Sequence, residues 1–552
     1  MVSTITDAIT TEEQLQAESS TRQNRSYHRT DAWNERNLLS LDGGGIRGIW
    51  TLLALERLMD FVAQVELNPR YFLGDCEELA PASDLLAAEH SFSPLAFPDH
   101  VSHGPFQSEE DARDYRKWKY GQRYLPCHYF DMIGGSSTGA LIAIMLGRLR
   151  MPVSDCLYEY KTLGEKIFGD PRVLTQLSFI IIPRAKYDSG TLTTVFKGVV
   201  RKREEVSNER NEDALFPSRL GLCRTFVTAI KQTPSDAGRA NEALLIRSYD
   251  NMRRLMQSET QRRANDSSRT QPGRAETDIS LARPSRFPTQ SNIVHRSSGE
   301  SSKWQIWKVA RAATAAPFYF RPLKEDTPVE VKYTDGGLQQ NNNPTKEGIA
   351  EIEKLHRPNP LGAVISIGTS RGNTHSRLPM KDKLMGIVRD GANPMNVHDE
   401  INERLGDHPY YRLDDHGALK MELDEWKPRG LRAKFGKKAG SRTMRTIEHK
   451  FFEWVGTADN AEMFRNCAKE LVRRRRARTM EEAKWAHYAT GIRYKCLGDD
   501  CHRADFTDRD EFVRHLQHEH ADEALFIGRN PEDVIEELPD EWRWSWQYPA
   551  PT

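Results

Sequence analysis

The pattern of apolar positions alternates along the chain between short strand-like runs and longer helix-like segments. The apolar run Leu38–Leu41 is followed by a glycine loop and then by a segment, 46–65, in which apolar residues recur at helical spacing. The same order of strand, glycine turn and helix returns at 129–149, where the helical part is apolar nearly all round. Further strands are predicted at 223–230, 243–249, 329–335 and 363–370, with a helix at 302–316. Strands that alternate with helices predict an α/β fold with a mainly parallel sheet covered on both faces.

Polar stretches divide the chain into regions. Residues 1–35 are poor in aliphatic side chains, so we expect a flexible leader there. A compact domain is predicted over 36–370, with insertions at about 66–120 and 252–302, of which the second is Arg- and Ser-rich and predicted to be disordered. After residue 370 the chain becomes basic and helical up to about 490, and it ends in a small module (491–522) and a tail (523–552).

Composition fits a protein with a core but says little about partners. Of the 552 residues, 38% are hydrophobic and 29% are charged, and Lys+Arg and Asp+Glu both number 79, so electrostatic arguments must be local. The most basic run is VRRRRAR at Val472–Arg478. It has three interpretations: a solvated helix face, a contact with anionic lipid, or a nuclear import signal.

Targeting signals and membrane spans are not evident in the sequence. The N-terminus has neither a basic region nor an apolar core typical of a secretory signal, and the apolar runs are far shorter than the ~20 residues that span a bilayer. The seven cysteines are scattered and odd in number, which argues against a disulfide framework. We therefore expect a cytoplasmic protein with peripheral membrane contact, or a nuclear one.

The segment GGSSTG carries a candidate nucleophile. It contains GxSxG at Gly135, Ser137 and Gly139, between a predicted strand and a predicted helix. Glycines two positions on either side let a strained strand-to-helix turn close, and the helix N-terminus faces the negative charge of an acyl-transfer intermediate. The alternative is a Gly/Ser turn that only packs a helix against a sheet.

The loop LLSLDGGGIRGIW admits two interpretations. Its match to GxGxxG suggests a dinucleotide site, which requires a second strand and an acidic residue about 20 positions on. Asp60 has the right spacing but lies inside the predicted helix, so this interpretation fails. The alternative is an oxyanion hole in which the backbone N–H groups of Gly43, Gly44 and Gly45 stabilise developing charge. Arg47 either adds a positive charge or is a first-turn surface arginine.

Asp335 is the candidate base. It ends a predicted strand and precedes Gly336 and Gly337, which let a carboxylate approach another loop closely. A partly buried aspartate with a raised pKa can accept the serine proton directly. A simple Asp-Gly tight turn is the alternative.

Taken together, five segments resemble the patatin-like phospholipase family. They are DGGGIRG (42–48), FDMIGGSSTGA (130–140), ARAATAAPFYF (310–320), DGGLQQNNNP (335–344) and SIGT (366–369). The match runs over about 37–370. It departs from the family at Ala315, where the family usually has serine.

The resemblance implies a three-layer α/β/α fold and a lipid acyl hydrolase. It assigns Ser137 as nucleophile, Asp335 as base, and the three loop glycines with Arg47 as oxyanion hole. It implies hydrolysis of carboxylic esters of phospholipids or other glycerolipids through an acyl-enzyme, with neither calcium nor a catalytic histidine. No catalytic cofactor is therefore expected.

Two rival functions stay open. The first is an esterase with a Ser-Asp-His triad, for which His356, His375, His398 and His408 are available downstream. The second is a regulator that binds nucleic acid or protein on an inactive hydrolase scaffold.

The C-terminal module resembles a two-cysteine, two-histidine zinc finger. Cys496 and Cys501 precede two phenylalanines, and His515 and His520 follow on a predicted helix, with His518 as the competing fourth ligand. Paired thiols and two histidines on one helix suit tetrahedral zinc, which holds a core too small to fold alone. A structural zinc and contact with nucleic acid or protein are thus predicted, an unmetallated helical tail being the alternative.

Overall fold

The computed structural model of the chain describes six main stretches. These are 32–68, 124–169, 185–250, 301–371, 393–428 and 439–520, with short gaps inside the third, fourth and sixth, together with 543–544. Residues 69–123 and 251–300, which hold nearly all of the two predicted insertions, lie outside the described residues, as do most of the leader and of the tail.

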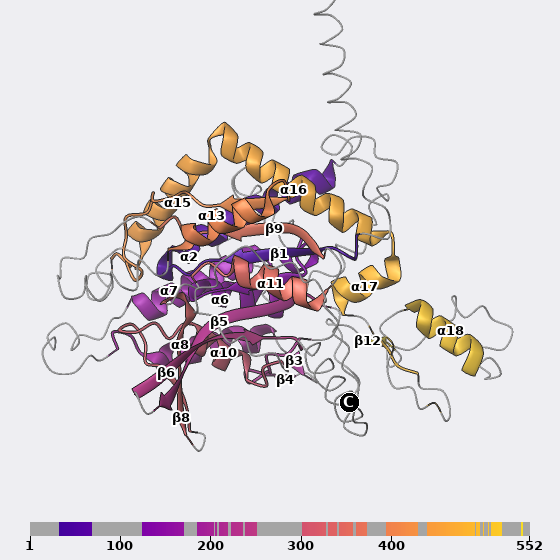
Figure 1. Ribbon diagram of the computed structural model, residues 1–552, viewed down its shortest axis with the longest axis horizontal. Helices are drawn as coiled ribbons and strands as arrows, with labels where there is room; N and C mark the ends of the chain where they lie inside the picture. The colour runs from indigo at the N-terminus through magenta and orange to yellow at the C-terminus, as the bar shows by residue number, and fades with distance from the viewer. Residues whose placement is uncertain are drawn as a thin grey trace, which may run out of the picture.

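A mixed eight-stranded sheet forms the centre of the described part of the molecule (Figure 1). In order of hydrogen-bonded neighbours, its strands are β10 (Tyr410–Leu413), β9 (Leu361–Ile367), β1 (Arg36–Leu41), β2 (Met132–Gly135), β5 (Arg224–Ser235), β8 (Glu330–Asp335) and β7 (Leu323–Asp326), and β6 (Gly238–Arg247) also pairs with β5. The first five run parallel, whereas β6, β7 and β8 join by antiparallel pairing.

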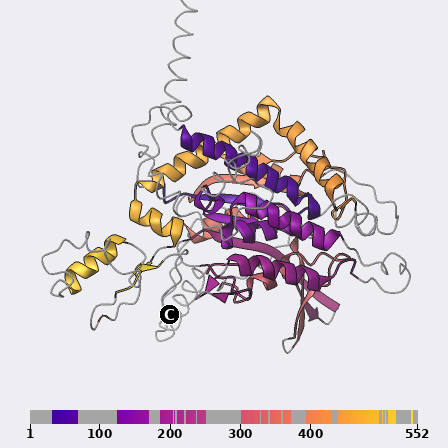
Figure 2. The same ribbon diagram turned by 180° about the vertical axis from the view of Figure 1, so that it is seen from behind.

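Helices cover both faces of the sheet. One face carries α11 (Thr345–Leu355) and α13 (Pro394–Leu405). The other face carries α2 (Gly48–Leu67), α6 (Thr138–Ala143), α7 (Val153–Phe168), α8 (Ser189–Arg203), α10 (Ile306–Ala313), α15 (Ser441–Val455) and α16 (Ala458–Thr479). Figure 2, seen from behind, shows the indigo α2 and the magenta helices in front of the strands. The predicted three-layer fold is confirmed.

Successive strand residues supply the two cores alternately, as the pleat of a sheet requires. Leu38 of β1 and Val364 of β9 pack beneath α11 and α13, whereas their neighbours Leu39 and Ile365 pack toward α2. Because both faces are buried, the central strands read as continuous apolar runs in the sequence.

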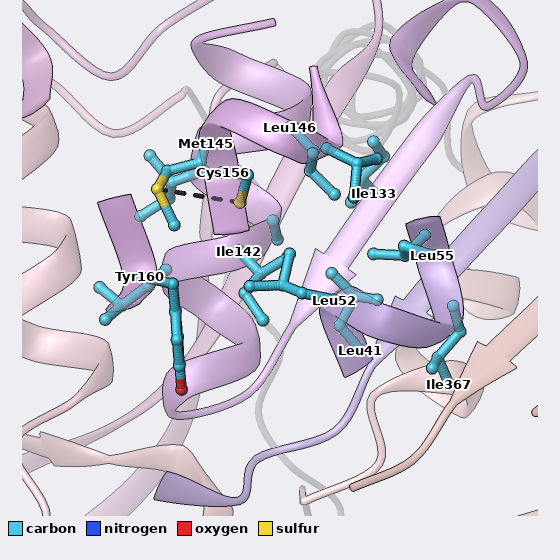
Figure 3. Packing of buried hydrophobic residues seen from close by; sticks show 14 of the residues in the cluster. Leu41, Leu52, Leu55, Ile133, Ile142, Met145, Leu146, Cys156, Tyr160 and Ile367 are labelled. Atoms are coloured by element: carbon cyan, nitrogen blue, oxygen red, sulfur yellow. Dashed lines mark hydrogen bonds between the residues drawn. The ribbon is translucent and has the colours of Figure 1, made fainter. Parts of the chain in front are cut away.

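The larger core lies between the sheet and α2, α6 and α7 (Figure 3). There Leu41, Ile133 and Ile367 come from three adjacent parallel strands and meet Leu52 of α2 and Ile142 of α6. All five side chains are fully buried. Full burial of a Leu or Ile side chain contributes roughly 1.5–3 kcal/mol to the stability of the folded state.

The segment after residue 370 belongs to the same fold. β10 extends the sheet beside β9, and α16 packs along α2. The predicted boundary at 370 therefore does not separate two cores, because the sheet edge at β9 is completed by a strand from the region predicted as basic and helical.

Four of the five arginines in the basic run at 472–478 are buried. Arg474, Arg475, Arg476 and Arg478 lie on α16 with exposed fractions of 4%, 6%, 2% and 1%. All three interpretations of this run as a solvated face, a lipid contact or an import signal require exposed arginines. They are wrong because the guanidinium groups pair with acidic side chains inside the protein.

Glu66, at the end of α2, is the acidic partner of two of these arginines. Its carboxylate accepts hydrogen bonds from Arg475 (2.6 Å), from Arg476 Nε (2.8 Å) and from the Tyr129 hydroxyl (3.0 Å). Arg476 also donates to the Glu66 backbone carbonyl at 2.7 Å. These contacts join α16 to α2 and to the segment that leads into β2.

Arg478 ties the start of the described chain to the same place. It donates to the backbone carbonyls of Ala32 (2.8 Å) and Glu35 (2.7 Å) and to the Asp131 carboxylate (2.7 Å). Trp33 is 6% exposed and packs with α17 (Glu482–Thr490). Residues 32–35 are therefore not part of a flexible leader, since Arg478 and α17 hold them against the domain.

Among the described residues, no helix combines the length and the apolarity that a membrane span requires.

The Glu66 cluster gives a stability prediction. Glu66→Gln leaves two buried guanidinium groups without their carboxylate, so we expect the free energy of unfolding to fall by about 3 kcal/mol. Glu353→Gln is the matched control, because the Glu353–Arg404 pair is 42% and 44% exposed, and a change under about 1 kcal/mol is expected. Urea denaturation of both variants measures the difference. Equal losses would contradict a structural role for the buried cluster.

Candidate active site

Ser137 lies on a tight turn between β2 and α6. β2 ends at Gly135, α6 begins at Thr138, and Ser137 itself has φ 52° and ψ −122°, a conformation that costs a non-glycine residue energy. A Cβ added to Gly135 would lie 2.1 Å from the Gly139 carbonyl oxygen. Only glycine fits there, so the GxSxG spacing reflects how closely α6 approaches the strand.

The strand β5 brings Ser137 and Asp335 together. Along one edge of β5, Val227 is paired with Gly135 of β2, and two residues later Ala229 is paired with Asp335 of β8. The other edge is taken by β6. Since β2 and β8 run in opposite directions along the same edge, their carboxyl ends meet, and the residues that end them become neighbours.

The side chains of these two residues are hydrogen-bonded. Ser137 Oγ lies 2.5 Å from Asp335 Oδ2, and the other carboxylate oxygen accepts the Gly337 N–H at 2.8 Å. Asp335 is 2% exposed, and its own N–H donates to the Ala315 carbonyl at 3.2 Å. Burial raises the pKa of Asp335 to about 6, although the hydrogen bonds from Ser137 and Gly337 lower it. The carboxylate is thus a stronger base than an exposed aspartate.

Thr228, the β5 residue between the two strand ends, supports both of them. Its hydroxyl donates to Ser136 Oγ at 3.0 Å, and Ser136 directly precedes Ser137. A Cβ on Gly336 would lie 2.4 Å from the Thr228 hydroxyl oxygen. The glycine after Asp335 is therefore required by a side chain of β5, which sequence reasoning did not single out.

The glycine loop lies beside Ser137. A Cβ on Gly43 would be 2.8 Å from the Ser137 Cβ. The Gly43 N–H donates to the Asn342 carbonyl at 3.1 Å, and the Gly44 N–H to the Thr138 hydroxyl at 3.1 Å. The loop is in the predicted place, but the Gly43 amide already has a backbone acceptor.

Arg47 is buried beneath this loop. It is 4% exposed, and both its Nε (3.3 Å) and its backbone N–H (3.2 Å) donate to the Gly44 carbonyl. In a trans peptide the next N–H points the opposite way from that carbonyl. Arg47 therefore fixes the direction of the Gly45 amide, and the surface-arginine interpretation is wrong because the side chain is enclosed.

A segment far along the chain, 419–428, crosses the glycine loop, and we call it the strap. The Leu423 carbonyl accepts the Ile46 N–H at 2.7 Å, and a Cβ on Gly45 would lie 2.0 Å from that carbonyl oxygen. The Tyr160 hydroxyl donates to the Gly45 carbonyl at 2.6 Å. Asp424, 1% exposed, holds the strap by accepting from the Tyr187 hydroxyl at 2.5 Å.

Arg412 of β10 anchors the start of the loop. Its guanidinium donates to both oxygens of Asp42 (3.1 and 2.6 Å), to Asp414 (2.9 Å) and to the Ser366 hydroxyl (2.8 Å). Burial lowers the pKa of Arg412, but the two carboxylates raise it by more, so the group stays charged. Sequence reasoning missed this residue because a lone arginine at a strand end carries no motif.

The described candidate histidines lie at the other edge of the sheet. His408 faces the carbonyl of Gly362 at the start of β9 (2.6 Å), and His398 faces the hydroxyl of Tyr410 at the start of β10 (2.9 Å). His356 lies 3.2 Å from Arg224 at the start of β5. Ser137 follows the carboxyl end of β2, so these three are not its partners, while His375 lies outside the described residues.

The four predicted metal ligands come together near the C-terminus. The ligand atoms of Cys496, Cys501, His515 and His520 all lie within 4.8 Å of one another. His518, the competing ligand, is exposed on α18 (Arg509–Glu519). A Cys₂His₂ cluster is therefore present, and the geometry selects His520.

The fold and the site define an α/β protein with a serine at a strand-to-helix elbow and a buried carboxylate at the same sheet edge. Residues 118–349 match the family described as patatin-like phospholipase. This match ends 21 residues short of the predicted limit at 370 and begins after the glycine loop, yet the loop, β9 and β10 share the same sheet.

Curated relatives are phospholipases. The calcium-independent phospholipase A2-gamma of Mus musculus is 24% identical over 306 residues, which is 54% of this chain and 32% of that protein. The protein of the same name from Rattus norvegicus is 26% identical over the same shares. Phospholipase A I of Arabidopsis thaliana is 25% identical over 332 residues, 55% of this chain and 23% of that protein. The matched part thus covers a third or less of these relatives.

The strap contact gives a second prediction. Gly45→Ala and Gly406→Ala both place a Cβ on a residue with φ near +60° (59° and 56°), and this backbone strain costs roughly 1–3 kcal/mol in each variant. The two sites differ in their surroundings. The Cβ at Gly45 would overlap the Leu423 carbonyl, whereas the Cβ at Gly406 would face open space. Because of this overlap, we expect the free energy of unfolding of Gly45→Ala to lie ~1–3 kcal/mol below that of Gly406→Ala. We also expect Gly45→Ala to slow the labelling of Ser137 by a fluorophosphonate.

Urea denaturation and the labelling rate measure these two effects. Gly406→Ala should label at the wild-type rate because Gly406 follows the end of α13, near His408 at the edge of the sheet where the parallel strands begin. Equal behaviour of the two variants would show that the strap does not shape the loop.

Proposed function

We propose that the chain hydrolyses carboxylic ester bonds of phospholipids or other glycerolipids through an acyl-enzyme on Ser137. The observation that carries the proposal is the 2.5 Å contact between Ser137 Oγ and the buried Asp335 carboxylate at a strand-to-helix elbow. The phospholipase relatives support a lipid ester as the substrate.

In the first step Ser137 Oγ attacks the ester carbonyl carbon while Asp335 Oδ2 accepts the hydroxyl proton. The carbonyl π electrons move onto the oxygen, which becomes an oxyanion. When the C–O bond to the alcohol breaks, the Asp335 carboxyl returns the proton to the leaving oxygen. An acyl-Ser137 ester and a free lysolipid or alcohol result.

The second step repeats this chemistry with water. Asp335 accepts a proton from a water molecule, whose oxygen attacks the acyl carbon, and then protonates Ser137 Oγ as the fatty acid leaves. One buried carboxylate thus serves as base and acid in turn. A pKa near 6 suits both roles, since the group must be ionised at rest but must release the proton readily.

The Gly44 and Gly45 amides are the proposed oxyanion donors. The Gly43 N–H is used by Asn342, whereas the Gly44 N–H contacts a hydroxyl, Thr138 Oγ1, that can rotate away. The Thr138 N–H is the first of α6 and therefore lacks an acceptor within that helix. Arg47 acts by orienting the Gly45 amide. Each such donor typically contributes about 3–4 kcal/mol to the transition state.

The rival functions have less support. A triad would require a histidine near Asp335, and the described candidates lie at the opposite edge of the sheet. An inactive scaffold would have no physical need to keep a buried, unneutralised carboxylate against a strained serine. The proposed reaction requires no calcium, because every proton and charge in it is handled by the chain.

Contact with a lipid surface is part of the proposal. Phe318 follows Ala315, whose carbonyl binds the Asp335 amide, and its ring is 43% exposed at φ 69°. An apolar side chain held outward near the reacting groups suits a peripheral, membrane-facing rim. A cytoplasmic location stays a prediction.

Hydrolysis by variants tests the mechanism. With a mixed panel of phospholipids, galactolipids and neutral lipids in the presence of chelator, we expect Ser137→Ala and Asp335→Asn each to lower kcat by about 10³-fold or more. Alanine variants of His356, His375, His398 and His408 should keep activity within roughly threefold. If one histidine variant is as inactive as Ser137→Ala while its unfolding curve is unchanged, the dyad is wrong.

The raised pKa of Asp335 predicts a pH dependence. The base must be ionised, so kcat/KM and fluorophosphonate labelling should fall about tenfold per pH unit below about 6 and be level above it. Ionisation costs more in the folded chain than in the unfolded chain. The free energy of unfolding of the wild type should therefore fall as pH rises from about 4 to about 6, relative to Asp335→Asn. A midpoint near the usual aspartate value of 3.8 would contradict the assignment.

A further inference from the structure

We propose that Cys496, Cys501, His515 and His520 bind one zinc ion that folds the C-terminal module, a role separate from ester hydrolysis. The module consists of the described parts of 493–520 with the returning strand β12 (Arg543–Trp544). The proposal does not depend on the proposed function.

The four ligand atoms lie close to the separations of a tetrahedral zinc site. Cys496 Sγ lies 3.1 Å from His520 Nε2, and Cys501 Sγ lies 3.4 Å from His515 Nε2. With Zn–S near 2.3 Å and Zn–N near 2.0–2.1 Å, a tetrahedron separates its ligand atoms by about 3.3–3.8 Å. Two sulfurs and two ring nitrogens are the donor set typical of structural zinc.

Local structure places the four ligands without using the catalytic domain. The backbone N–H and carbonyl of Tyr494 bond those of Phe506 (2.9 and 2.8 Å), which closes the loop that contains both cysteines. Helix α18 carries His515, and the His520 N–H donates to the Leu516 carbonyl at 3.2 Å, which continues the last turn.

The apolar core of the module is too small to fold unaided. Its cluster consists of Tyr494, Cys496, Phe506, Phe512, Val513 and Leu516. Six side chains fall far short of what a stable domain buries, so small modules of this kind depend on a metal or a disulfide. Two thiolates neutralise one Zn²⁺, so the buried site carries no net charge. Metal binding then supplies the folding energy.

The module also includes a strand from the predicted tail. β12 pairs antiparallel with β11 (Arg493–Tyr494), in the register Arg493↔Trp544 and Tyr494↔Arg543. The predicted tail is thus not free at 543–544. Loss of the metal should release both α18 and β12.

The module attaches near the edge of the sheet where the parallel strands begin, whereas Ser137 lies at the edge where β2 ends. α17 contacts η2 (Pro126–His128), which precedes β2, and Arg150 donates to the Ala489 carbonyl there. Figure 1 shows α18 and β12 beyond α17, at the side of the molecule. A metal in this module cannot reach the reacting atoms, so its role is structural.

The first measurement uses the full chain as purified. We expect about one zinc per chain by plasma mass spectrometry, and a Co²⁺-exchanged protein with the thiolate charge-transfer and tetrahedral bands of an S₂N₂ site. Absence of bound zinc, or a cobalt spectrum without thiolate bands, would overturn the proposal. These readouts need no variant and so do not depend on a variant's folding.

Variants identify the ligands. Cys501→Ser and His515→Ala should bind less than about a tenth of the wild-type zinc, because each removes one of four ligands. His518→Ala is the matched control, since this exposed histidine is on the same helix turn, and it should bind zinc normally. If His518→Ala loses zinc and His520→Ala does not, the proposed ligand set is wrong.

A chelator separates the two sites. After treatment with a strong zinc chelator, limited proteolysis should cut within 493–544 about tenfold faster than in the untreated protein. Fluorophosphonate should label Ser137 at the same rate before and after the treatment. Loss of labelling together with zinc would refute the structural role. Failure of lipid hydrolysis with intact zinc binding would instead refute the proposed function alone.

Discussion

The hydrogen bond between Ser137 and Asp335 depends on a single strand, β5. Two strands that are nearly 200 residues apart in the sequence share one edge of it and run toward each other. The pairing of Val227 with Gly135 and of Ala229 with Asp335 leaves room for one β5 residue, Thr228, between the strand ends. Ser137 and Asp335, the two candidate catalytic residues, are therefore positioned by backbone pairing, which is far stiffer than a side chain on a loop.

The remaining parts of the site hold the glycine loop against this pair. Arg412 binds Asp42 at the start of the loop, and Arg47 donates a hydrogen bond to the Gly44 carbonyl. The strap packs against Gly45 through the Leu423 carbonyl. Each support comes from a different part of the chain, including β10 and the strap after residue 400. This explains why the fold continues past the matched family region: the loop that lies beside Ser137 is held by residues from the C-terminal half.

The elbow at Ser137, the position of Asp335 and the central strands could be predicted from the sequence, because local residue patterns indicate them. Glycines at the elbow and after Asp335 mark close backbone approaches, and continuous apolar runs mark buried parallel strands. β7 and β10 were not predicted, since LKED and YYRL lack a clear apolar pattern and owe their strand structure to neighbours. The arginine run was misread for the same reason: Glu66 and Asp131, which neutralise it, are more than 300 residues away.

Charge in the C-terminal half is used for internal contacts more than for partners. Arg475, Arg476 and Arg478 of α16 pair with the buried carboxylates of Glu66 and Asp131, so these three offer little to a phosphate backbone. In the module, residues 496–520 contain seven Asp and Glu against three Arg. Binding to nucleic acid requires an excess of cations, because affinity comes largely from released counterions. Neither these arginines of α16 nor the C-terminal module therefore gives much support to the predicted nucleic-acid contact. The module pairs its strand β11 with β12 from the predicted tail, and a structural role explains this arrangement better.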